Sequence, residues 1–168
     1  MQETGYIIKH DEQTYEIHTD IIINAAPEQV WAVLTDFAAM PNWSSTFKGI
    51  EGRLKHGGQV YSLYQNGDEY VKAPHTVYVV DGVKFWWSDE FNVIAGMRDN
   101  HHYIVNDAGN GQTRFIQKDT HTGRGQLQLS DGTQIPMNAQ ILTASQLEPF
   151  MQFNRELKAE CERRFADF

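Results

Sequence analysis

The chain has 168 residues, of which 40% are hydrophobic and 21% are charged, and this composition predicts one globular domain with a single core over residues 1–168. Its formal net charge of −8 at pH 7 argues against the basic face that a nucleic acid or an anionic membrane surface would require. The one cysteine, Cys161, excludes an internal disulfide.

The beginning of the chain is not expected to be a targeting or membrane segment. Residues 1–13 are polar, lack the basic and apolar regions of a signal peptide, and are expected to be flexible. No run of about 18 apolar residues occurs, so stable insertion into a membrane is not expected. We therefore expect a cytoplasmic protein, and the sequence leaves a homodimer open.

A half-buried strand is predicted for residues 14–24, where apolar and polar side chains alternate. A helix should follow, because Pro27 suits the first helical position and apolar residues then recur at helical spacing from 30 to 37. Asp36 is expected to cap a second short helix, which Pro41 would end after about one turn.

Six further strands are predicted between residues 47 and 121. Asp-Gly, Asn-Gly and Gly-Gly turn signals separate several of them. The expected strands are 47–55, 58–66, 74–81, 83–91, 99–106 and 112–121. Their short connections favour antiparallel neighbours, since a parallel crossover needs about a dozen or more residues.

The C-terminal part begins with a segment for which two structures are open. Residues 122–140 alternate on both sides of an Asp-Gly turn and predict either a small hairpin or an irregular flap. Residues 143–166 predict the longest helix, with an apolar stripe on one face. Only this helix is long enough to fill a curved sheet, and an apolar cavity is expected where it fills the sheet incompletely.

Three segments carry a resemblance to a known family. Residues 23–43 contain Ala-Pro, Val-Trp and Pro-x-Trp elements; residues 85–123 contain a tryptophan strand, a histidine-plus-aromatic strand and a Gly-x-Thr-Arg-Phe strand; residues 153–165 match the closing helix. In this order they resemble the START-like, pollen-allergen-like helix-grip superfamily (SRPBCC), in its polyketide cyclase/dehydrase and lipid-transport branch. The resemblance extends over residues 14–168.

The resemblance implies an α+β helix-grip fold. Its parts are a curved antiparallel sheet of about seven strands, a long C-terminal helix inside the curve, and two short helices after the first strand. Folds of this superfamily carry many functions, so the fold alone does not name the chemistry. Residues 124–136 are more polar than the matching part of relatives, and we expect them to border the mouth of the cavity.

Two dipeptides place candidate ligand contacts on neighbouring strands. Only one histidine of His101-His102 and one indole of Trp86-Trp87 can face the cavity, because adjacent strand residues point to opposite faces. Tyr103 belongs to the same cluster. An inward histidine could orient a ligand or move a proton. Hydrogen bonding within the core and plain aromatic packing are the competing, and favoured, interpretations.

Further candidates lie on the last predicted strand and the last helix. Asp119 and His121 share a strand face with Phe115. They predict either an Asp–His proton relay or, in keeping with the usual exposure of charged groups, a solvated face. Asn154 interrupts the apolar stripe that contains Phe150, so its amide should bond to the backbone, which we favour, or to a ligand.

Neither a cofactor nor a metal site is predicted, and catalytic residues stay unassigned. The histidines lack His-x-x-x-His and Glu-x-x-His spacing, and Cys161 has no neighbouring cysteine. The Gly109-x-Gly111 pair is a hairpin turn without the rest of a dinucleotide fingerprint, and no Gly-x-Ser-x-Gly elbow occurs.

The favoured function is binding or transport of a small hydrophobic molecule, such as a lipid, polyketide or aromatic compound, in the cavity. The alternative is a cyclase, aromatase or dehydratase in which a cavity His or Tyr transfers protons. A docking module ranks third, because the single apolar stripe of the last helix is assigned to the core. The candidate ligand contacts are Trp86, Trp87, His101, His102, Tyr103, Phe115, His121, Phe150 and Asn154.

Overall fold

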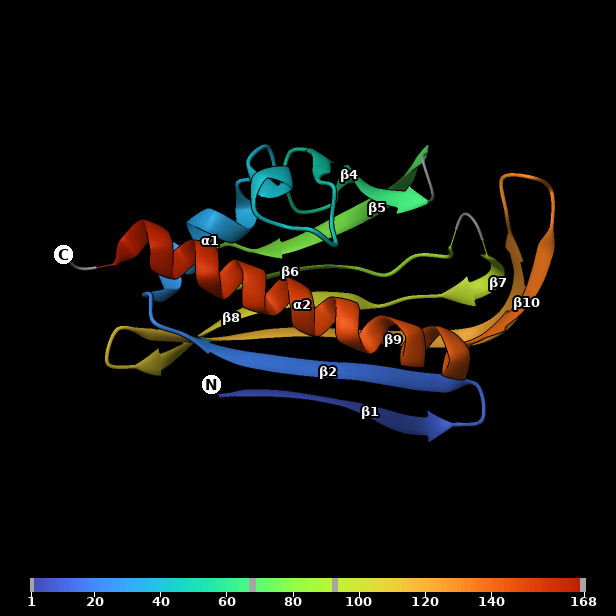
Figure 1. The fold of residues 1–168 in the computed structure, drawn as a ribbon, viewed down its shortest axis with the longest axis horizontal. Coiled ribbons are helices and arrows are strands. Elements are labelled where there is room, and N and C mark those ends of the chain that lie inside the picture. The colour runs from blue at the N-terminus through green and yellow to red at the C-terminus, as the bar shows by residue number, and fades with distance from the viewer. Residues whose placement is uncertain (1, 67–68, 92–93, 167–168) are drawn as a thin grey trace.

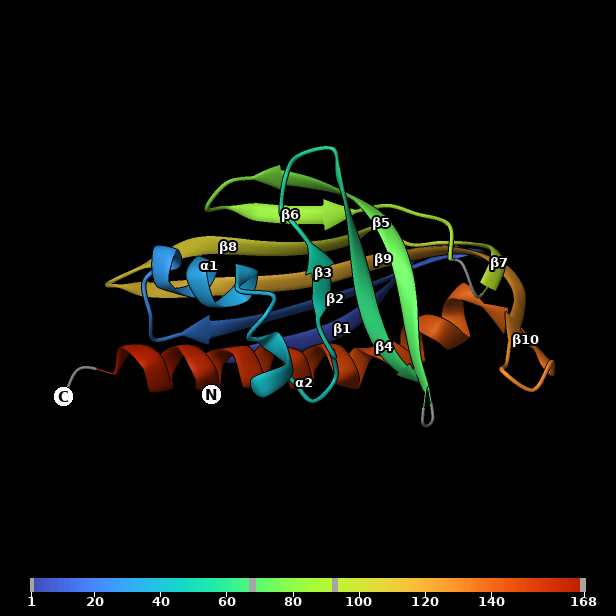
Figure 2. The ribbon, with the colours of Figure 1, turned by 90° about the horizontal axis from the view of Figure 1, so that it is seen from above.

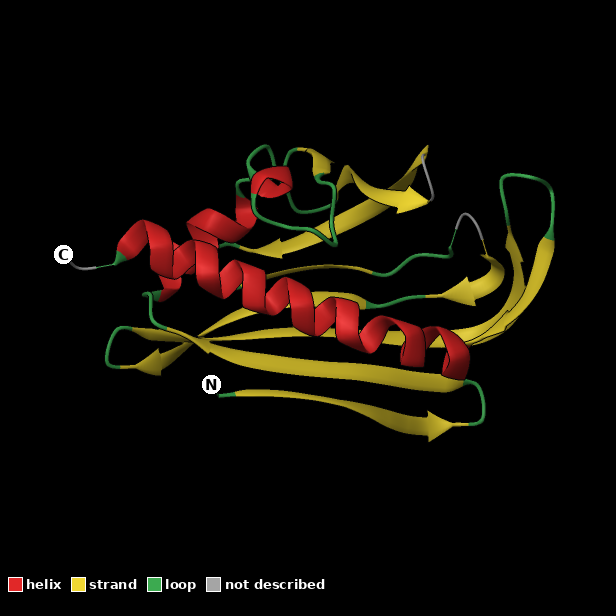
Figure 3. Cartoon of the chain, viewed as in Figure 1, coloured by secondary structure: helices red, strands yellow, loops and turns green. Residues whose placement is uncertain are grey.

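The structure is a computed structural model that describes residues 2–66, 69–91 and 94–166. A curved sheet packs against one long C-terminal helix (Figures 1 and 3). The helices are α1 (Pro27–Thr35), the 3₁₀ helix η1 (Met40–Asn42) and α2 (Ala139–Phe165). The strands are β1 (Glu3–Asp11), β2 (Thr14–Ile23), β3 (Ile50–Gly52), β4 (Gly58–Asn66), β5 (Glu69–Val80), β6 (Lys84–Trp87), β7 (Ile94–Arg98), β8 (His101–Gly109), β9 (Gln112–Gln128) and β10 (Gln134–Asn138).

The ten strands in the described part of the chain form one antiparallel sheet. Its order is β1-β2-β9-β8-β6-β5-β4-β3, and β7 and β10 also pair with β9. Figure 2 shows the sheet bending around the side on which α1 and α2 lie. The predicted α+β helix-grip fold is confirmed, with more strands than the seven expected. Within the described part of the chain, no helix combines the length and apolar character needed to cross a membrane.

β1 differs from the expectation for the start of the chain. Residues 3–11, expected to be flexible, pair with β2, with Glu3 opposite Ile21. Most side chains of β1 are exposed because this strand forms an edge of the sheet, and the sequence therefore lacks the clear alternation of β2. The guanidinium of Arg155 on α2 holds Glu3 with three hydrogen bonds of 2.9–3.1 Å.

The break after α1 brings aromatic side chains to the long helix. α1 begins at Pro27 as predicted, but the second helix predicted after Asp36 is wrong. Asp36 ends α1, and the next helical turn is η1, which contains Pro41. Proline is tolerated there because N–H groups of a first turn have no helical partner. Just beyond η1, Trp43 packs on Phe153 of α2 with ring centroids 5.3 Å apart.

Several predicted strands have different bounds. The strand predicted for 47–55 is reduced to β3, the one predicted for 83–91 is reduced to β6, and β7 was not predicted. For residues 122–140 the hairpin interpretation is confirmed, because β9 continues to Gln128 and pairs with β10. The last helix begins at Ala139, earlier than predicted.

β7 meets β9 at a close crossing of two glycines. Gly96 and Gly123 have φ of 90° and 100°, which favour glycine. A Cβ at Gly123 would lie 2.3 Å from the carbonyl oxygen of Gly96, so no side chain fits between the strands. This crossing supports a small apolar cluster of Tyr15, Ile94, Met97 and Ala139 at the start of α2.

The main core lies between α1, the rest of α2 and the sheet. It contains Phe85 and Trp87 of β6 and Phe153, Leu157 and Cys161 of α2, all of them buried. This large cluster and the small cluster beside β7 are separate. The functional site lies between them.

Candidate functional site

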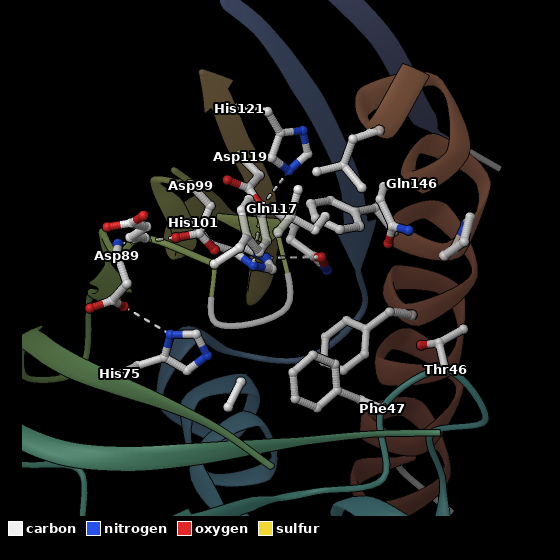
Figure 4. A pocket seen from close by; sticks show the side chains of 18 of the residues that line it. Thr46, Phe47, His75, Asp89, Asp99, His101, Gln117, Asp119, His121 and Gln146 are labelled. Carbon is white, nitrogen blue, oxygen red and sulfur yellow. Dashed lines mark hydrogen bonds and ion pairs between the residues drawn. The ribbon is translucent and has the colours of Figure 1, made fainter. Parts of the chain in front are cut away.

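A cavity of about 230 Å³ separates the two apolar clusters beneath α2 (Figure 4). Its apolar lining is formed by Phe47, Ala73, Pro74, Phe91, Ile94, Leu142, Pro149, Phe150 and Phe153. Its polar lining is formed by His75, Asp89, Glu90, Asp99, His101, Gln117, Asp119 and His121, with Thr46 and Gln146 at the helix side. The cavity agrees with the sequence-based expectation, but its polar wall does not.

The polar wall results from the pairing of β8 with β9. His101 lies directly opposite Asp119 in the ladder. Side chains two residues apart share a face of a strand, so His121 points to the same side of β9 as Asp119. Asp99 lies in the connection between β7 and β8, and a carboxyl oxygen of it lies within 4.8 Å of ligand-type atoms of His101 and Asp119. All four residues are at most 5% exposed. The register and the β7–β8 connection together therefore gather two carboxyl groups and two imidazoles at the cavity.

Asp119 is the central carboxylate of this group. Its Oδ1 accepts a hydrogen bond of 3.1 Å from the Asn100 backbone N–H, and its Oδ2 accepts one of 3.1 Å from Nε2 of His121. Nδ1 of His101 lies 3.5 Å from the same Oδ2. Burial acts to raise the pKa of Asp119, but the two histidines and the Asn100 N–H hold that pKa below its ordinary value.

Asp99 has the opposite behaviour. Its Oδ1 accepts a hydrogen bond of 3.2 Å from the backbone N–H of Asp89. Burial, followed by the negative charge of Asp119, raises the pKa of Asp99 well above its ordinary value. Two carboxyl groups that line one cavity thus have pKa values displaced in opposite directions, an arrangement common where proton transfer or ion binding occurs.

His101 is a neutral imidazole at pH 7. Burial lowers its pKa to about 4, although Asp119 opposes the shift. Its Nε2 lies 3.3 Å from Oε1 of Gln117, and Phe150 stacks on its ring with centroids 4.8 Å apart. His121 is held in turn by Oγ1 of Thr143 on α2, 2.8 Å from its Nδ1. Both imidazoles are therefore fixed in orientation.

A chain of buried hydrogen bonds continues from His101 toward the helix. Nε2 of Gln117 donates to Oδ1 of Asn154 over 3.1 Å, and Nδ2 of Asn154 donates to Oγ1 of Thr19 over 2.8 Å. The Thr19 hydroxyl donates to the backbone carbonyl of Gln117 over 2.7 Å. Asn154 is thus bonded within the protein and lies behind the cavity lining.

His75 completes the polar wall from β5. Its Nδ1 is 2.8 Å from a carboxylate oxygen of Asp89, and its ring stacks on Trp87 with centroids 4.4 Å apart. Burial lowers the pKa of His75. Sequence reasoning missed this residue, although its alternation with Ala73 and Val77 in one strand was a signal that it faces inward.

The structure divides the sequence-predicted contacts into three groups. Those that line the cavity are His101, His121 and Phe150. Those that are buried behind the lining are Trp87, Tyr103, Phe115 and Asn154. Trp86 and His102 lie on the outer face and stack on each other, with centroids 5.7 Å apart and planes at 2°. The two-residue period that turns Trp87 and His101 inward turns these two outward, so they do not reach the cavity.

The solvated face preferred for Asp119 and His121 is wrong, because both are buried. Burial is tolerated since each has hydrogen-bond partners on neighbouring elements. Asp99 and Gln117 were missed as site residues. Both occur at two-residue spacing from predicted candidates, which is the signal that could have found them.

Comparison with known proteins supports the resemblance inferred from the sequence. Residues 14–85 match the family model described as polyketide cyclase/dehydrase and lipid transport. No protein of curated function matches the chain in sequence. The resemblance to the polyketide cyclase/dehydrase and lipid-transport family is thus confirmed for residues 14–85.

Solved structures share the fold at low sequence identity. A START superfamily protein from Mycobacterium smegmatis superposes with a TM-score of 0.68 at 12% identity, covering 89% of this chain and 98% of the other. The Zhui aromatase/cyclase from Streptomyces sp. R1128 gives 0.69 at 12% identity over 90% and 95%. Ara h 8.0201 gives 0.61 at 8% identity over 89% and 99%. At such identities the likeness concerns architecture alone.

Proposed function

For a chain that resembles this helix-grip superfamily, we propose that the cavity binds a small, compact hydrophobic molecule that carries at least one oxygen function. The observation that carries the proposal is that one and the same cavity has aromatic side chains on one part of its lining and hydrogen-bonding groups on another. Ligand sites of this kind combine apolar burial with a few polar groups that set orientation.

The size of the cavity narrows the ligand class. A dry cavity of about 150 Å³ accommodates benzene, and here about 230 Å³ is present. This space suits a molecule of one or two rings, which supports the aromatic class among the ligands considered above over an extended lipid chain. Phe150, stacked on His101 at 4.8 Å, supplies an aromatic surface next to the polar wall.

The polar wall offers several hydrogen-bonding roles to such a ligand. A hydroxyl group can donate to the Asp119 carboxylate, and a carbonyl can accept from the Asp99 carboxyl in its protonated form, which burial and the Asp119 charge favour by raising its pKa. Apolar contact supplies about 25 cal/mol per Å² of buried ligand surface. Hydrogen bonds then select among ligands of similar size, because an unpaired buried group on the wall is costly.

A filling substitution tests the proposal. Ala73 lines the cavity and is buried, whereas Thr76 on the same strand is exposed. We expect Ala73→Leu to weaken binding of one-ring and two-ring phenols and ketones at least about tenfold in calorimetry, while Thr76→Leu leaves it unchanged. Absence of binding across the panel, or equal affinities in the two variants, would contradict the proposal.

A second candidate is an enzyme of the cyclase, aromatase or dehydratase kind. The buried arrangement of Asp119 between His101 and His121 favours it, because a carboxylate that orients an imidazole is a usual proton-transfer unit. Turnover should fall about 100-fold or more in His101→Ala and His121→Ala and stay constant in His102→Ala, whose side chain is outside. Equal rates in all three variants would exclude histidine chemistry in the cavity.

A further inference from the structure

Three ligand-type atoms from Asp99, His101 and Asp119 converge on one point of the polar wall. One carboxylate oxygen of each aspartate and one ring nitrogen of the histidine all lie within 4.8 Å of one another, and all three residues are buried (Figure 4). The three side chains also line the cavity. This arrangement belongs to no catalytic or metal motif that the sequence displays.

The protonation of His101 follows from the hydrogen-bond chain behind it. The backbone carbonyl of Gln117 can only accept, so the Thr19 hydroxyl must donate to it. The Thr19 oxygen then accepts from Nδ2 of Asn154, which leaves Oδ1 of Asn154 to accept from the Gln117 amide. Oε1 of Gln117 is therefore the atom that faces Nε2 of His101, and Nε2 must carry the hydrogen.

The other ring nitrogen of His101 is consequently a lone-pair donor. A neutral imidazole has one hydrogen, so Nδ1 carries none when Nε2 is protonated. Nδ1 faces Oδ2 of Asp119 at 3.5 Å, and that oxygen also has only lone pairs to offer. Among the described residues, no hydrogen bond reaches Nδ1 of His101. Two electron-pair donors thus face each other inside the protein with no donor hydrogen between them.

We propose that Asp99, His101 and Asp119 bind a divalent transition-metal ion of the Zn²⁺, Mn²⁺ and Fe²⁺ class. A cation at this point converts the opposed lone pairs from a repulsive contact into coordination bonds. It also balances two buried carboxyl groups that otherwise lie side by side. One imidazole nitrogen with two carboxylate oxygens suits these ions better than Ca²⁺ or Mg²⁺, which prefer oxygen ligands alone.

The geometry agrees with such a site. Ligand bonds of about 2.0–2.2 Å place neighbouring donor atoms roughly 3.4 Å apart around a tetrahedral ion. The 3.5 Å between Nδ1 of His101 and Oδ2 of Asp119 already has this spacing, and Asp99 lies within reach of it. Three protein ligands would leave a coordination position toward the cavity, as in catalytic metal sites.

The surroundings also resemble those of known metal ligands. A metal-bound histidine normally donates its second N–H to an oxygen, as Nε2 of His101 does to Gln117. A ligating carboxylate is normally hydrogen-bonded, as Asp119 is by His121 and the Asn100 N–H. Sequence motifs missed this set because it combines an aspartate of the β7–β8 connection, the first residue of β8 and that residue's partner opposite in the ladder, instead of residues on one helix.

Metal titration tests the site without reference to any organic ligand. Tag-free protein is stripped with a chelator and titrated with Co²⁺, followed by the visible absorption of the bound ion, and then with Zn²⁺ in competition. We expect one equivalent bound with micromolar or tighter affinity. Asp99→Asn, His101→Gln and Asp119→Asn should each weaken binding by about 100-fold or more. His102→Gln, on the outer face next to His101, is the matched control and should bind as the wild type.

Absence of binding up to millimolar metal, or unchanged binding in the three variants, would overturn the proposal. X-ray absorption on zinc-loaded wild-type protein removes the dependence on variants that fail to fold. The expected shell has one imidazole among oxygen donors, and a shell with two or more imidazoles, with sulfur, or with water alone would also overturn it. The proposal stands independently of the cavity's organic ligand, since metal-free protein can be tested for that ligand separately.

Discussion

The dipeptides Trp86-Trp87 and His101-His102 put the same two residue types on both faces of one sheet. Inside, Trp87 is fully buried and meets His101 edge to face, with centroids 5.3 Å apart and planes at 68°. Outside, Trp86 and His102 lie parallel and half-buried. The two dipeptides therefore contribute the same residue types to both faces, and only the surroundings distinguish the inner pair from the outer pair.

The two histidines show how much the surroundings matter. Burial lowers the pKa of both to about 4. Asp119 opposes the shift at His101, whereas Lys118 and then Lys84 reinforce it at His102. The inner imidazole is thus neutral beside an anion, where a cation or a ligand hydroxyl can be bound. The outer imidazole is neutral beside two lysines, which disfavour a further cation.

Truncation of each indole should give the largest difference in stability between the inner and the outer face. Trp87→Ala removes a fully buried ring that contacts Phe85, Tyr103 and His75, and should cost about 3–5 kcal/mol of unfolding free energy. Trp86→Ala should cost about 1 kcal/mol, since its ring is partly solvated. Denaturant unfolding of both variants measures the difference, and similar losses would show that the two faces are energetically alike.

Loss of one buried hydroxyl should have the next largest effect. Thr19→Val leaves the Asn154 amide without its acceptor and should cost about 1–3 kcal/mol. Thr120→Val, at a half-buried position on β9, should change stability by less than about 0.5 kcal/mol. Denaturant unfolding measures both variants. An unchanged unfolding free energy in Thr19→Val would mean that the hydrogen-bond chain behind His101 does not stabilise the fold.

The lowered pKa of His75 should make the stability of the protein depend on pH. Its pKa is lowered by burial, against the opposing influence of Asp89 and Asp119, so on acidification the unfolded chain takes up a proton before the folded chain does. Stability should therefore fall as pH decreases below about 6.5, by less than about 1.4 kcal/mol per pH unit from this residue. Unfolding at several pH values should give a shallower slope for His75→Gln than for the wild type. An unchanged slope would contradict this assignment.

Loss of the outer stack of Trp86 on His102 should have the smallest effect on stability and ligand binding. His102→Gln removes an exposed-side aromatic contact and should cost about 0.5–1 kcal/mol, with cavity ligand affinity unchanged. Denaturant unfolding and calorimetry with the best phenol or ketone ligand measure both quantities. A marked loss of ligand affinity would place the outer face in the binding function after all.

The architecture was largely predictable because local sequence patterns identify most of its helices and strands. The alternation over 14–24, the turn signals and the apolar stripe of the last helix each identify an element from neighbouring residues alone. β7 escaped because its burial pattern does not alternate regularly and it crosses β9 through a glycine contact. β1 escaped because an exposed edge strand has little apolar pattern to read.

The site was predictable only in part. The sequence alone does not say which residue of each dipeptide points into the molecule. The pairing register of β6 with β8, which places Trp87 opposite His101, is needed to decide it. The burial of Asp119 contradicts the usual exposure of aspartate, and its explanation lies in Asn100 and His121, whose contacts depend on the fold of β8 and β9. Asp99 becomes significant only when Asp119 is placed opposite His101.

The hydrogen bond from Thr19 to the Gln117 carbonyl gives the buried network one direction, because a main-chain oxygen can only accept. Loss of either amide would let the His101 ring exchange tautomers, pointing a hydrogen toward the carboxylates. Nδ1 of His101 would then present a hydrogen in place of a lone pair to the cavity, while the backbone stayed as it is.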